Sequence, residues 1–573
     1  MASLLRRGFL LTMLALATWN SIHSHASPPA ITRQPSSLTV GAGVPASFSV
    51  NASPGSSFQW LRDGVPMEGA NGQALTFTNT TFSDAASYSL IVWNEFGTNV
   101  SSSATLTVLP GMRLSQIANI VTPGGSNQSF AYWVRVVGNL AIVADSHLQF
   151  YDITDPSAPV HLSTYAGSRG IFGFYVTNNL VYALAGNYLE IVNFSDPRNP
   201  VRIADRTYLA ITATDIVVRD NLAYIASTGP FAIYDVSNLT NVVRRGVNNS
   251  FMGYTVELVD DIAYLGGTDL GVPIFDISNP TLPLRTNILR PGFVDVVKIA
   301  DDRLYAAGSI FAVYDIRDRR RPRPLAEPVR AAAFASQGMS ARGDFMFTGN
   351  KSTSVTQPRP YFSVFDAGDP SQLIEVARLT LSSNGPVENV DLVGDYVYFT
   401  SHRNLEIYKI EPATNPPVLL RGIGNVLSAT NAPAELQAHA TGGEQLTFQW
   451  FYNNNELPGQ TNRALRLAKV TVAETGEYSV RISNSAGSIT NTGSLQLTAP
   501  PLFSPTIAPG DARGRRLTLT FPAGFQTRLE ATSNLTNWIE VARMQSSGAA
   551  TNLYDGPGLG EEWRFYRLNY GWD

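Results

Sequence analysis

Histidine and cysteine are the side chains that most often carry nucleophilic, acid–base or metal chemistry, and this sequence is poor in both. It has no cysteine in 573 residues, which excludes thiolate catalysis, disulfide bridges and Cys-based metal sites. Beyond the N-terminal segment the histidines are His147, His161, His402 and His439, none with the His-x3-His spacing of a metal site. Phosphate-binding loops, dinucleotide fingerprints and Gly-x-Ser-x-Gly nucleophile motifs are also missing. We therefore predict no cofactor, no metal and no catalytic residue.

A series of aspartates recurs through the middle of the chain, each after an aromatic residue and before a turn. The members are Asp152, Asp235, Asp276, Asp315 and Asp366. Carboxylates in series suggest calcium, but Asn193 and Lys409 interrupt the pattern, which a shared metal role would not tolerate well. We favour the alternative that each carboxylate accepts backbone N–H bonds from its own turn.

Two further motifs are charged. Arg342-Gly343-Asp344 is an integrin-type adhesion tripeptide, but it falls where other repeats carry Gly-Asn or Asp-Asn, so we interpret it as a tight turn. The densest basic cluster consists of Arg317, Arg319, Arg320, Arg321 and Arg323, diluted by Asp315 and Asp318. Such a cluster suits an acidic polymer, although a solvated loop is the interpretation we favour.

The elements that must position these residues repeat with a period near 41. The anchor residues of the first apolar run in each unit are Ile142, Tyr182, Tyr224, Tyr264, Tyr305, Phe347 and Tyr398. Each unit has room for four short strands rich in Val, Ile and Tyr, which predicts a seven-bladed β-propeller over residues 112–410. The seventh unit lacks its outer strand, and Met112–Ile120 is predicted to supply it and so remove an open sheet edge.

The repeats also resemble a known family. Leu148-Gln149-Phe150-Tyr151-Asp152-Ile153 and Phe231-Ala232-Ile233-Tyr234-Asp235-Val236 are similar to LVIVD repeats of secreted and surface proteins. The resemblance covers about half of the chain and implies a propeller. It implies little about activity, and the Trp-Asp marks of WD40 repeats are not present.

Residues 28–109 and 414–498 form a second repeat. Trp60, Leu75, Asp84, Tyr88 and Gly97 recur 390 positions later as Trp450, Leu465, Glu474, Tyr478 and Gly487. A single tryptophan and a later tyrosine are typical of an immunoglobulin sandwich, and the residues before the tyrosine resemble the I-set. Apolar residues, Val50 and Leu90 in the first domain and Ala438 and Val480 in the second, stand where that family carries its disulfide.

The ends of the chain predict a secretory signal and a C-terminal module, and the composition indicates the fold class. Residues 1–26 have the basic start, short apolar run and small-residue end of a secretory signal, and no other run predicts a membrane span in the mature chain. Residues 506–573, after a proline-rich linker, are predicted to form a small C-terminal β-sandwich-like module of the kind seen in secreted bacterial proteins. The fold class is all-β, and a net charge of −4 gives no reason to expect nucleic acid.

We place the ligand site on one propeller face. Loops that join second to third strands, and fourth strands to the next unit, share a face, and both immunoglobulin domains should attach to the opposite one. The candidate ligand-binding residues on the open face are His147, Arg169, Tyr208, His402 and Arg403. We expect a secreted or cell-surface, non-catalytic binding or adhesion protein whose partner is an extracellular protein or polysaccharide. The alternative is an extracellular glycan-active enzyme with its site at the propeller mouth.

Overall fold

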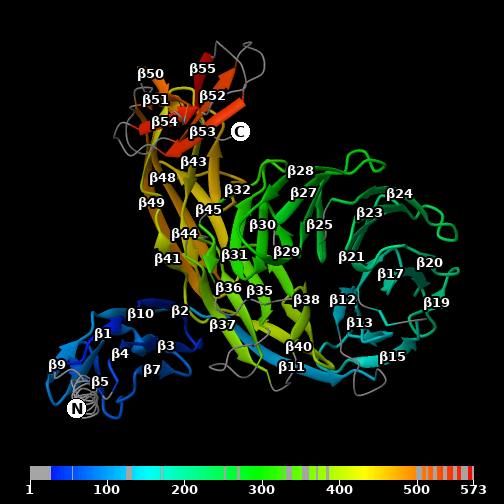
Figure 1. Ribbon diagram of the computed structural model, residues 1–573, viewed down its shortest axis with the longest axis horizontal. Helices are drawn as coiled ribbons and strands as arrows, with labels where there is room; N and C mark the ends of the chain where they lie inside the picture. Colours follow the sequence, from blue (N-terminus) through cyan, green and yellow to red (C-terminus); the bar gives the residue numbers. More distant parts are fainter. Residues whose placement is uncertain are drawn as a thin grey trace, which may run out of the picture. The chain divides into compact units, whose positions relative to one another are not determined.

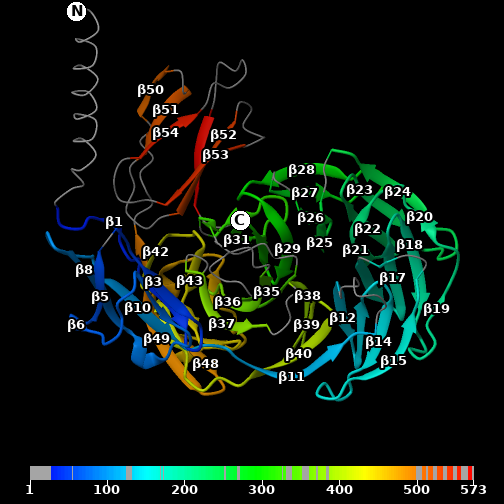
Figure 2. The ribbon, with the colours of Figure 1, turned by 60° about the horizontal axis from the view of Figure 1, so that its bottom comes forward.

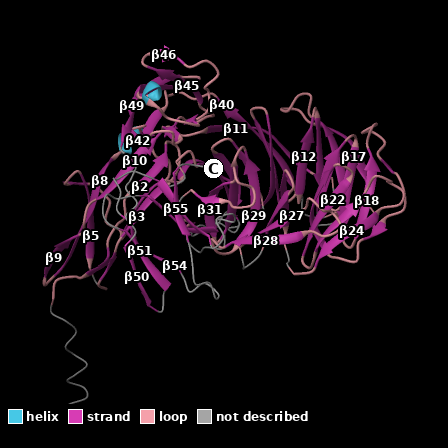
Figure 3. Ribbon diagram, turned by 90° about the horizontal axis from the view of Figure 1, so that it is seen from above, coloured by secondary structure: helices cyan, strands magenta, loops and turns pink. Residues whose placement is uncertain are grey.

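The computed structural model divides the chain into two compact units, Met1–Gly111 and Met112–Asp573. Residues 1–26, where the signal is predicted, lie outside the described residues, as do 55, 124–131, 168–169, 172, 251–252, 268–270, 326, 331–337, 351–359, 370–371, 382–385, 499–505, 512–513, 520–525, 533–538, 546–550, 556–564 and 571–573. Strands dominate the described part, in agreement with the all-β prediction (Figure 3). Among the described residues no helix has the length and apolarity needed to cross a bilayer.

The first unit is a β-sandwich built around one tryptophan. Its strands are β1 (Ile31–Arg33), β2 (Leu38–Gly41), β3 (Ala46–Ser49), β4 (Asn51–Ala52), β5 (Ser57–Arg62), β6 (Val65–Pro66), β7 (Ala74–Phe77), β8 (Ala86–Asn94), β9 (Gly97–Val100) and β10 (Ala104–Leu109). Trp60 is fully buried and donates its indole N–H to the carbonyl of Gly72 over 3.0 Å. The hydroxyl of Tyr88 donates to the carbonyl of Asp84 over 2.7 Å, as in a tyrosine corner. Val50 and Leu90 are buried beside them, so apolar packing occupies the place of the missing disulfide.

The second unit begins with a series of four-stranded antiparallel sheets, one for each sequence repeat. The first four are β12–β15 (Trp133–Val137, Leu140–Ala144, Leu148–Asp152, Val160–Tyr165), β16–β19 (Gly173–Thr177, Leu180–Ala185, Tyr188–Asn193, Val201–Arg202), β21–β24 (Ala213–Arg219, Leu222–Ser227, Phe231–Asp235, Val243–Asn248) and β25–β28 (Thr255–Val259, Ile262–Gly266, Val272–Asp276, Leu284–Leu289). They continue as β29–β32 (Val294–Ala300, Arg303–Gly308, Ile310–Asp315, Arg323–Pro324), β34–β37 (Met339–Arg342, Phe345–Asn350, Tyr361–Asp366, Ile374–Thr380) and β38–β40 (Val387–Val393, Tyr396–Ser401, Asn404–Glu411). Short strands β20 (Thr207–Tyr208) and β33 (Val329–Arg330) pair with β18 and β31.

The ring of sheets is closed by a strand from its own beginning. β11 (Arg113–Val121) pairs antiparallel with β40, from Arg113 opposite Glu411 to Val121 opposite Asn404 (Figure 2). This confirms the predicted outer strand for the last repeat. Each innermost strand contacts the next one along the chain, and β38 contacts β12, so the series returns to its start.

Polar side chains join neighbouring innermost strands at several of these contacts. The carboxylate of Asp215 accepts the backbone N–H of Val256 in the next sheet over 3.0 Å. Between the last and first sheets, the amide oxygen of Asn389 accepts the N–H of Val134 over 3.1 Å. These bonds satisfy strand-edge groups that face a neighbouring sheet, and they complement the apolar packing between sheets.

A second sandwich and a terminal module complete this unit (Figure 1). The sandwich contains β41 (Val418–Arg421), β42 (Asn425–Ala429), β43 (Ala434–Gln437), β44 (His439–Thr441), β45 (Thr447–Tyr452), β46 (Asn455–Glu456), β47 (Ala464–Leu467), β48 (Gly476–Asn484) and β49 (Gly487–Thr498). Trp450 is fully buried with its N–H on the carbonyl of Asn462 at 2.8 Å, and Ala438 and Val480 are buried in the same core. The terminal module has two three-stranded sheets, from β50 (Thr506–Asp511), β51 (Gly514–Leu519) and β54 (Thr551–Asp555), and from β52 (Gln526–Thr532), β53 (Ile539–Gln545) and β55 (Phe565–Tyr570).

Candidate functional site

The repeated aspartates cap the turns between third and fourth strands. Asp152 accepts the backbone N–H of Thr154 over 2.9 Å, and Asp276 accepts that of Ser278 over 3.0 Å. The same i to i+2 bond forms at Asp235, Asp315 and Asp366, and Asn193 replaces the carboxylate with an amide. In the described ranges no group of three His, Cys, Asp or Glu side chains is placed to hold a metal ion. The turn interpretation of the aspartate series is therefore confirmed.

Two of the candidate loops on the open face rest on buried acids. His147 lies in the β13–β14 turn, where its ring nitrogen Nδ1 is 3.0 Å from the hydroxyl of Ser146. Below it Asp145 is 1% exposed, and its Oδ1 accepts the backbone N–H of His147 over 3.3 Å and the side-chain amide of Gln149 over 3.1 Å. The buried carboxylate thus holds the turn that presents the histidine.

The β39–β40 turn repeats this arrangement. Glu406 is 1% exposed and accepts hydrogen bonds from the hydroxyl of Ser401 and, over 3.1 Å, from the amide of Gln116 in β11. Burial raises the pKa of Glu406. His402 in this turn has a positive φ of 53°, and the carbonyl of Arg403 accepts the N–H of Thr122 over 2.8 Å. The closing strand therefore also fixes the loop that carries His402 and Arg403.

Tyr208 is the most exposed of the candidates that the structure describes. Its side chain is 60% exposed, and its ring centre lies 5.4 Å from that of Tyr188, its cross-strand neighbour in β18. The guanidinium of Arg206 lies 4.2 Å from the centre of the Tyr188 ring. Two tyrosines and an arginine on a paired strand form a rigid polar and aromatic platform, of the composition that dominates binding hot spots.

One candidate residue cannot be placed, and several buried acids were not among the candidates. Arg169 lies outside the described residues. The pKa is raised to about 6 at two other carboxyls, Asp215 and Asp366, because both are buried. Sequence reasoning missed the buried acids Asp145 and Glu406, whose only signal is an acidic residue flanking a second-to-third strand turn.

On the opposite face the Arg342-Gly343-Asp344 turn is used inside the protein. Gly343 has a φ of 54°, which suits glycine. The Asp344 carboxylate forms ion pairs with Arg303 of the neighbouring sheet, at 2.9 Å, and with Arg463 of the second sandwich. Arg463 also donates to the carbonyl of Gly368 over 3.1 Å. The aspartate that an adhesion receptor would need is only 14% exposed, so the turn interpretation is confirmed.

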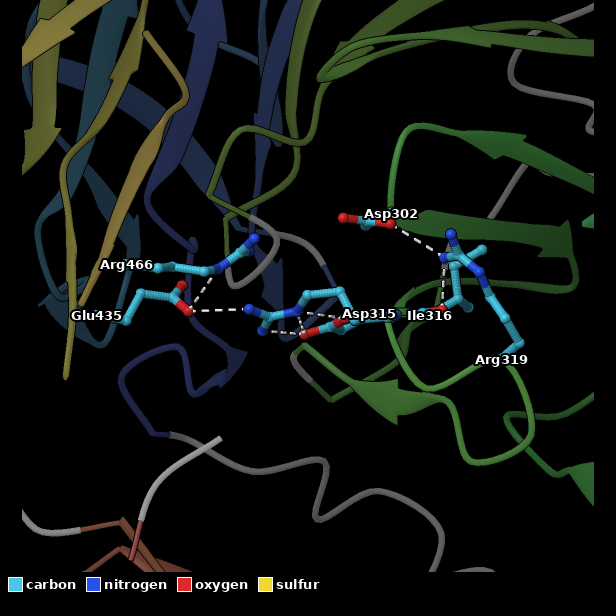
Figure 4. A network of polar contacts seen from close by, with 7 residues as sticks. Asp302, Asp315, Ile316, Arg319, Glu435 and Arg466 are labelled. Atoms are coloured by element: carbon cyan, nitrogen blue, oxygen red, sulfur yellow. Dashed lines mark hydrogen bonds and ion pairs between the residues drawn. The ribbon is translucent and has the colours of Figure 1, made fainter. Parts of the chain in front are cut away.

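The basic cluster also joins the propeller to the second sandwich. Arg317 pairs with Asp315 and, at 3.0 Å, with Glu435, which in turn accepts from Arg466 over 3.2 Å (Figure 4). Arg319 pairs with Asp260 at 3.1 Å and with Asp302 at 3.0 Å. The expectation of a solvated loop is therefore wrong for Arg317 and Arg319, which are 25% and 24% exposed because carboxylates from other elements surround them.

Two buried titratable groups lie at the same junction. His439 is 4% exposed, its Nδ1 lies 2.8 Å from the carbonyl of Gly368, and its Nε2 lies 2.7 Å from the guanidinium of Arg421. Burial lowers the pKa of His439, and the neutral ring can donate through Nδ1 and accept through Nε2. Burial, together with the nearby Asp344 carboxylate, raises the pKa of Asp366 to about 6. All of these contacts reach turns between first and second or third and fourth strands, the face predicted for domain attachment.

Comparison with known proteins agrees with this architecture. Residues 28–94 match the description "Immunoglobulin domain", residues 417–497 match "Immunoglobulin I-set domain", and residues 130–166, 212–246 and 255–287 match "LVIVD repeat". The chain carries immunoglobulin-like domains and LVIVD repeats. Such domains are typical of binding and adhesion-type proteins and are typically non-catalytic.

Individual relatives are distant. Over 96 residues the chain is 27% identical to the muscle M-line assembly protein unc-89 of Caenorhabditis elegans. The matched segment covers 14% of this chain and 1% of that protein. A quinonprotein alcohol dehydrogenase-like protein from Bacteroides thetaiotaomicron is 12% identical with a TM-score of 0.34, covering 67% of this chain and 99% of that one. Titin domain M7 is 22% identical over 14% of this chain and 94% of its own, with a TM-score of 0.14.

Proposed function

We propose that the protein is a non-catalytic binding or adhesion protein, secreted or held at the cell surface, whose seven-bladed propeller presents one loop face to an extracellular protein or polysaccharide. The observation that carries this proposal is the position of the second immunoglobulin domain. Its ion pairs reach the turns of Asp344 and Arg317, on the face opposite the candidate loops.

The candidate loops are suited to binding because their supports are rigid. The turns of His147 and His402 rest on buried acids, and Tyr208 is held in a paired strand. Side chains fixed before a partner arrives lose little conformational freedom on binding. The exposed side chain of Tyr208 supplies contact area and a directed hydrogen bond to either a protein or a glycan.

The test is a binding screen with paired variants. The full chain is presented to arrays of extracellular proteins and polysaccharides, and each hit is measured again after His147, Tyr208, His402 and Arg403 are replaced by alanine. The matched control replaces Arg198 and Leu282, exposed residues of third-to-fourth strand turns on the opposite face. We expect the open-face variant to lose binding and the control to retain it. If the open-face variant retains binding and the control variant loses it, the ligand site lies on the opposite face and the proposal is wrong.

A further inference from the structure

The junction between the propeller and the second immunoglobulin domain contains a cavity of about 620 Å³, here called the junction crease. Its propeller wall includes Asp301 and Asp344, and its immunoglobulin wall includes Gln437, Gln445 and Asn462. Ligand sites commonly have volumes of roughly 300–1,000 Å³ and lie at domain interfaces. The crease is therefore large enough for a small ligand and lies at a suitable place in the fold.

The charges of the crease are already balanced. Asp344 lies between Arg303 and Arg463, and Arg466 pairs with Glu435. Asp302 is engaged by Arg319. An anionic ligand would have to compete with these carboxylates for the guanidinium groups, and a cationic ligand would have to compete with the arginines for every lining carboxylate except that of Asp301. A neutral ligand avoids this competition.

The uncommitted groups in the crease are polar. Within the described part of the chain, the side-chain amides of Gln437 and Gln445 and the carboxylate of Asp301 have no hydrogen-bond or ion-pair partner. The apolar lining residues Leu446 and Phe448 are each 7% exposed, and the guanidinium of Arg463 lies 5.2 Å from the centre of the Phe448 ring. The crease thus offers donors and acceptors but little apolar surface for the side chains of a peptide.

We propose that the junction crease is a second ligand site, for a neutral oligosaccharide. Each sugar hydroxyl both donates and accepts hydrogen bonds, and so matches amides that donate and accept beside a carboxylate that accepts. The walls are rigid. The carbonyl of Asn462 is held by the buried indole of Trp450 at 2.8 Å, and Gly343 lets Gln445 approach the propeller turn. A Cβ at position 343 would collide with the side-chain oxygen of Gln445. The site is separate from the open face.

The experiment measures binding of neutral β-linked hexasaccharides of glucose, mannose, xylose and N-acetylglucosamine to the full chain by isothermal titration calorimetry. The test variant is Gln437→Ala with Gln445→Ala. Gln496→Ala, an exposed glutamine on β49 of the same domain, is the matched control. The double variant loses two neutral hydrogen bonds, so its dissociation constant should rise by about tenfold. Gln496→Ala and the open-face variant should bind like the original chain.

Each other outcome overturns the inference. If none of the four sugars binds, or if the double variant binds them equally well, the crease is not a saccharide site. If only the open-face variant loses sugar binding, the sugar belongs to the open face, which would support the proposed function and not this site. If acidic polysaccharides such as polygalacturonate bind through the two glutamines and neutral sugars do not, the argument from balanced charge is wrong. Hydrogen exchange that slows in β43 and β47 on sugar addition would locate the expected contact.

Discussion

Replacing Asp344 with alanine should weaken the attachment of the second immunoglobulin domain to the propeller. The carboxylate is 14% exposed and sits between Arg303 and Arg463, which are 15% and 12% exposed. Removing one partner of a buried ion pair leaves an uncompensated charge and typically costs 3–5 kcal/mol. Because all three groups keep some contact with solvent, we expect the lower end of this range, about 3 kcal/mol.

Hydrogen exchange is the suitable assay because the chain has several domains and a single free energy of unfolding is not defined for it. Amides of β45 and β47 should exchange faster in Asp344→Ala. Asp395→Ala is the matched control, because Gly394-Asp395 forms the corresponding turn in the next repeat with an exposed carboxylate. A surface substitution of this kind should change the free energy of opening by less than about 0.5 kcal/mol.

A double-mutant cycle with Arg463→Ala isolates the ion pair itself. We expect a coupling free energy between the two substitutions of about 0.5–3 kcal/mol, the usual range for residues in one network. The reasoning is refuted if Asp344→Ala and Asp395→Ala have equal effects, or if the substitutions at 344 and 463 are additive.

Four further predictions concern the junction, the core of the second sandwich and the closing strand. The pKa of Asp366 is raised to about 6, so the stability that this carboxyl contributes is fully present below its ordinary pKa of 3.8 and is lost as the pH rises through 6. Asp366→Asn should therefore raise the free energy of local opening by up to about 3 kcal/mol at pH 7 and not at pH 4, measured by hydrogen exchange in β36. The lowered pKa of His439 has the opposite sign, because its contribution is present above the ordinary value of 6.5 and is lost on acidification, so His439→Gln should flatten the decline of stability between pH 6.5 and 5. Trp450→Ala should lower the free energy of opening of the second sandwich by about 3–5 kcal/mol, measured by hydrogen exchange in β45 and β48, and a loss below about 1 kcal/mol would contradict the placement of Trp450 in the core. Deleting residues 112–121 removes β11 and exposes the edge of β40, so the truncated chain should associate in sedimentation experiments, whereas a stable monomer would contradict its closing role.

Repeat patterns made the fold predictable. Tyr224, Tyr264 and Tyr305 recur because each sheet buries the same strand position against its neighbour, and all three are nearly fully buried. The pairing of β11 with β40 was also predictable. The last repeat lacks its outer strand, and the segment before the first repeat has the sequence of such a strand, so pairing the two completes the last sheet. Trp60 and Trp450 identified both sandwiches without their cysteines because the tryptophan core is formed by apolar packing.

The junction was not predictable, because it depends on contacts between residues that no local pattern connects. Arg317 meets Glu435 across 118 positions of sequence, and neither residue is unusual in its own segment. The arginine cluster looks like a solvated loop when it is read alone, since the carboxylates that neutralise it belong to other repeats and another domain. Similarly, nothing in the sequence around His439 indicates a buried neutral ring. The backbone carbonyl of Gly368 and the guanidinium of Arg421 that define its environment are brought to it only by folding.

This dependence on distant partners explains why the adhesion tripeptide misleads. Arg342-Gly343-Asp344 has the composition of a recognition motif, but each feature has a use within the protein. The glycine provides a positive φ and room for Gln445, and the aspartate provides the charge that Arg303 and Arg463 share. The arginine donates to the carbonyl of Gly394 in the next turn. A receptor that bound this aspartate would have to break two ion pairs at the junction, at a cost similar to that of Asp344→Ala. Recognition is therefore more favourable on the open face, where the exposed side chain of Tyr208 is not committed to holding domains together.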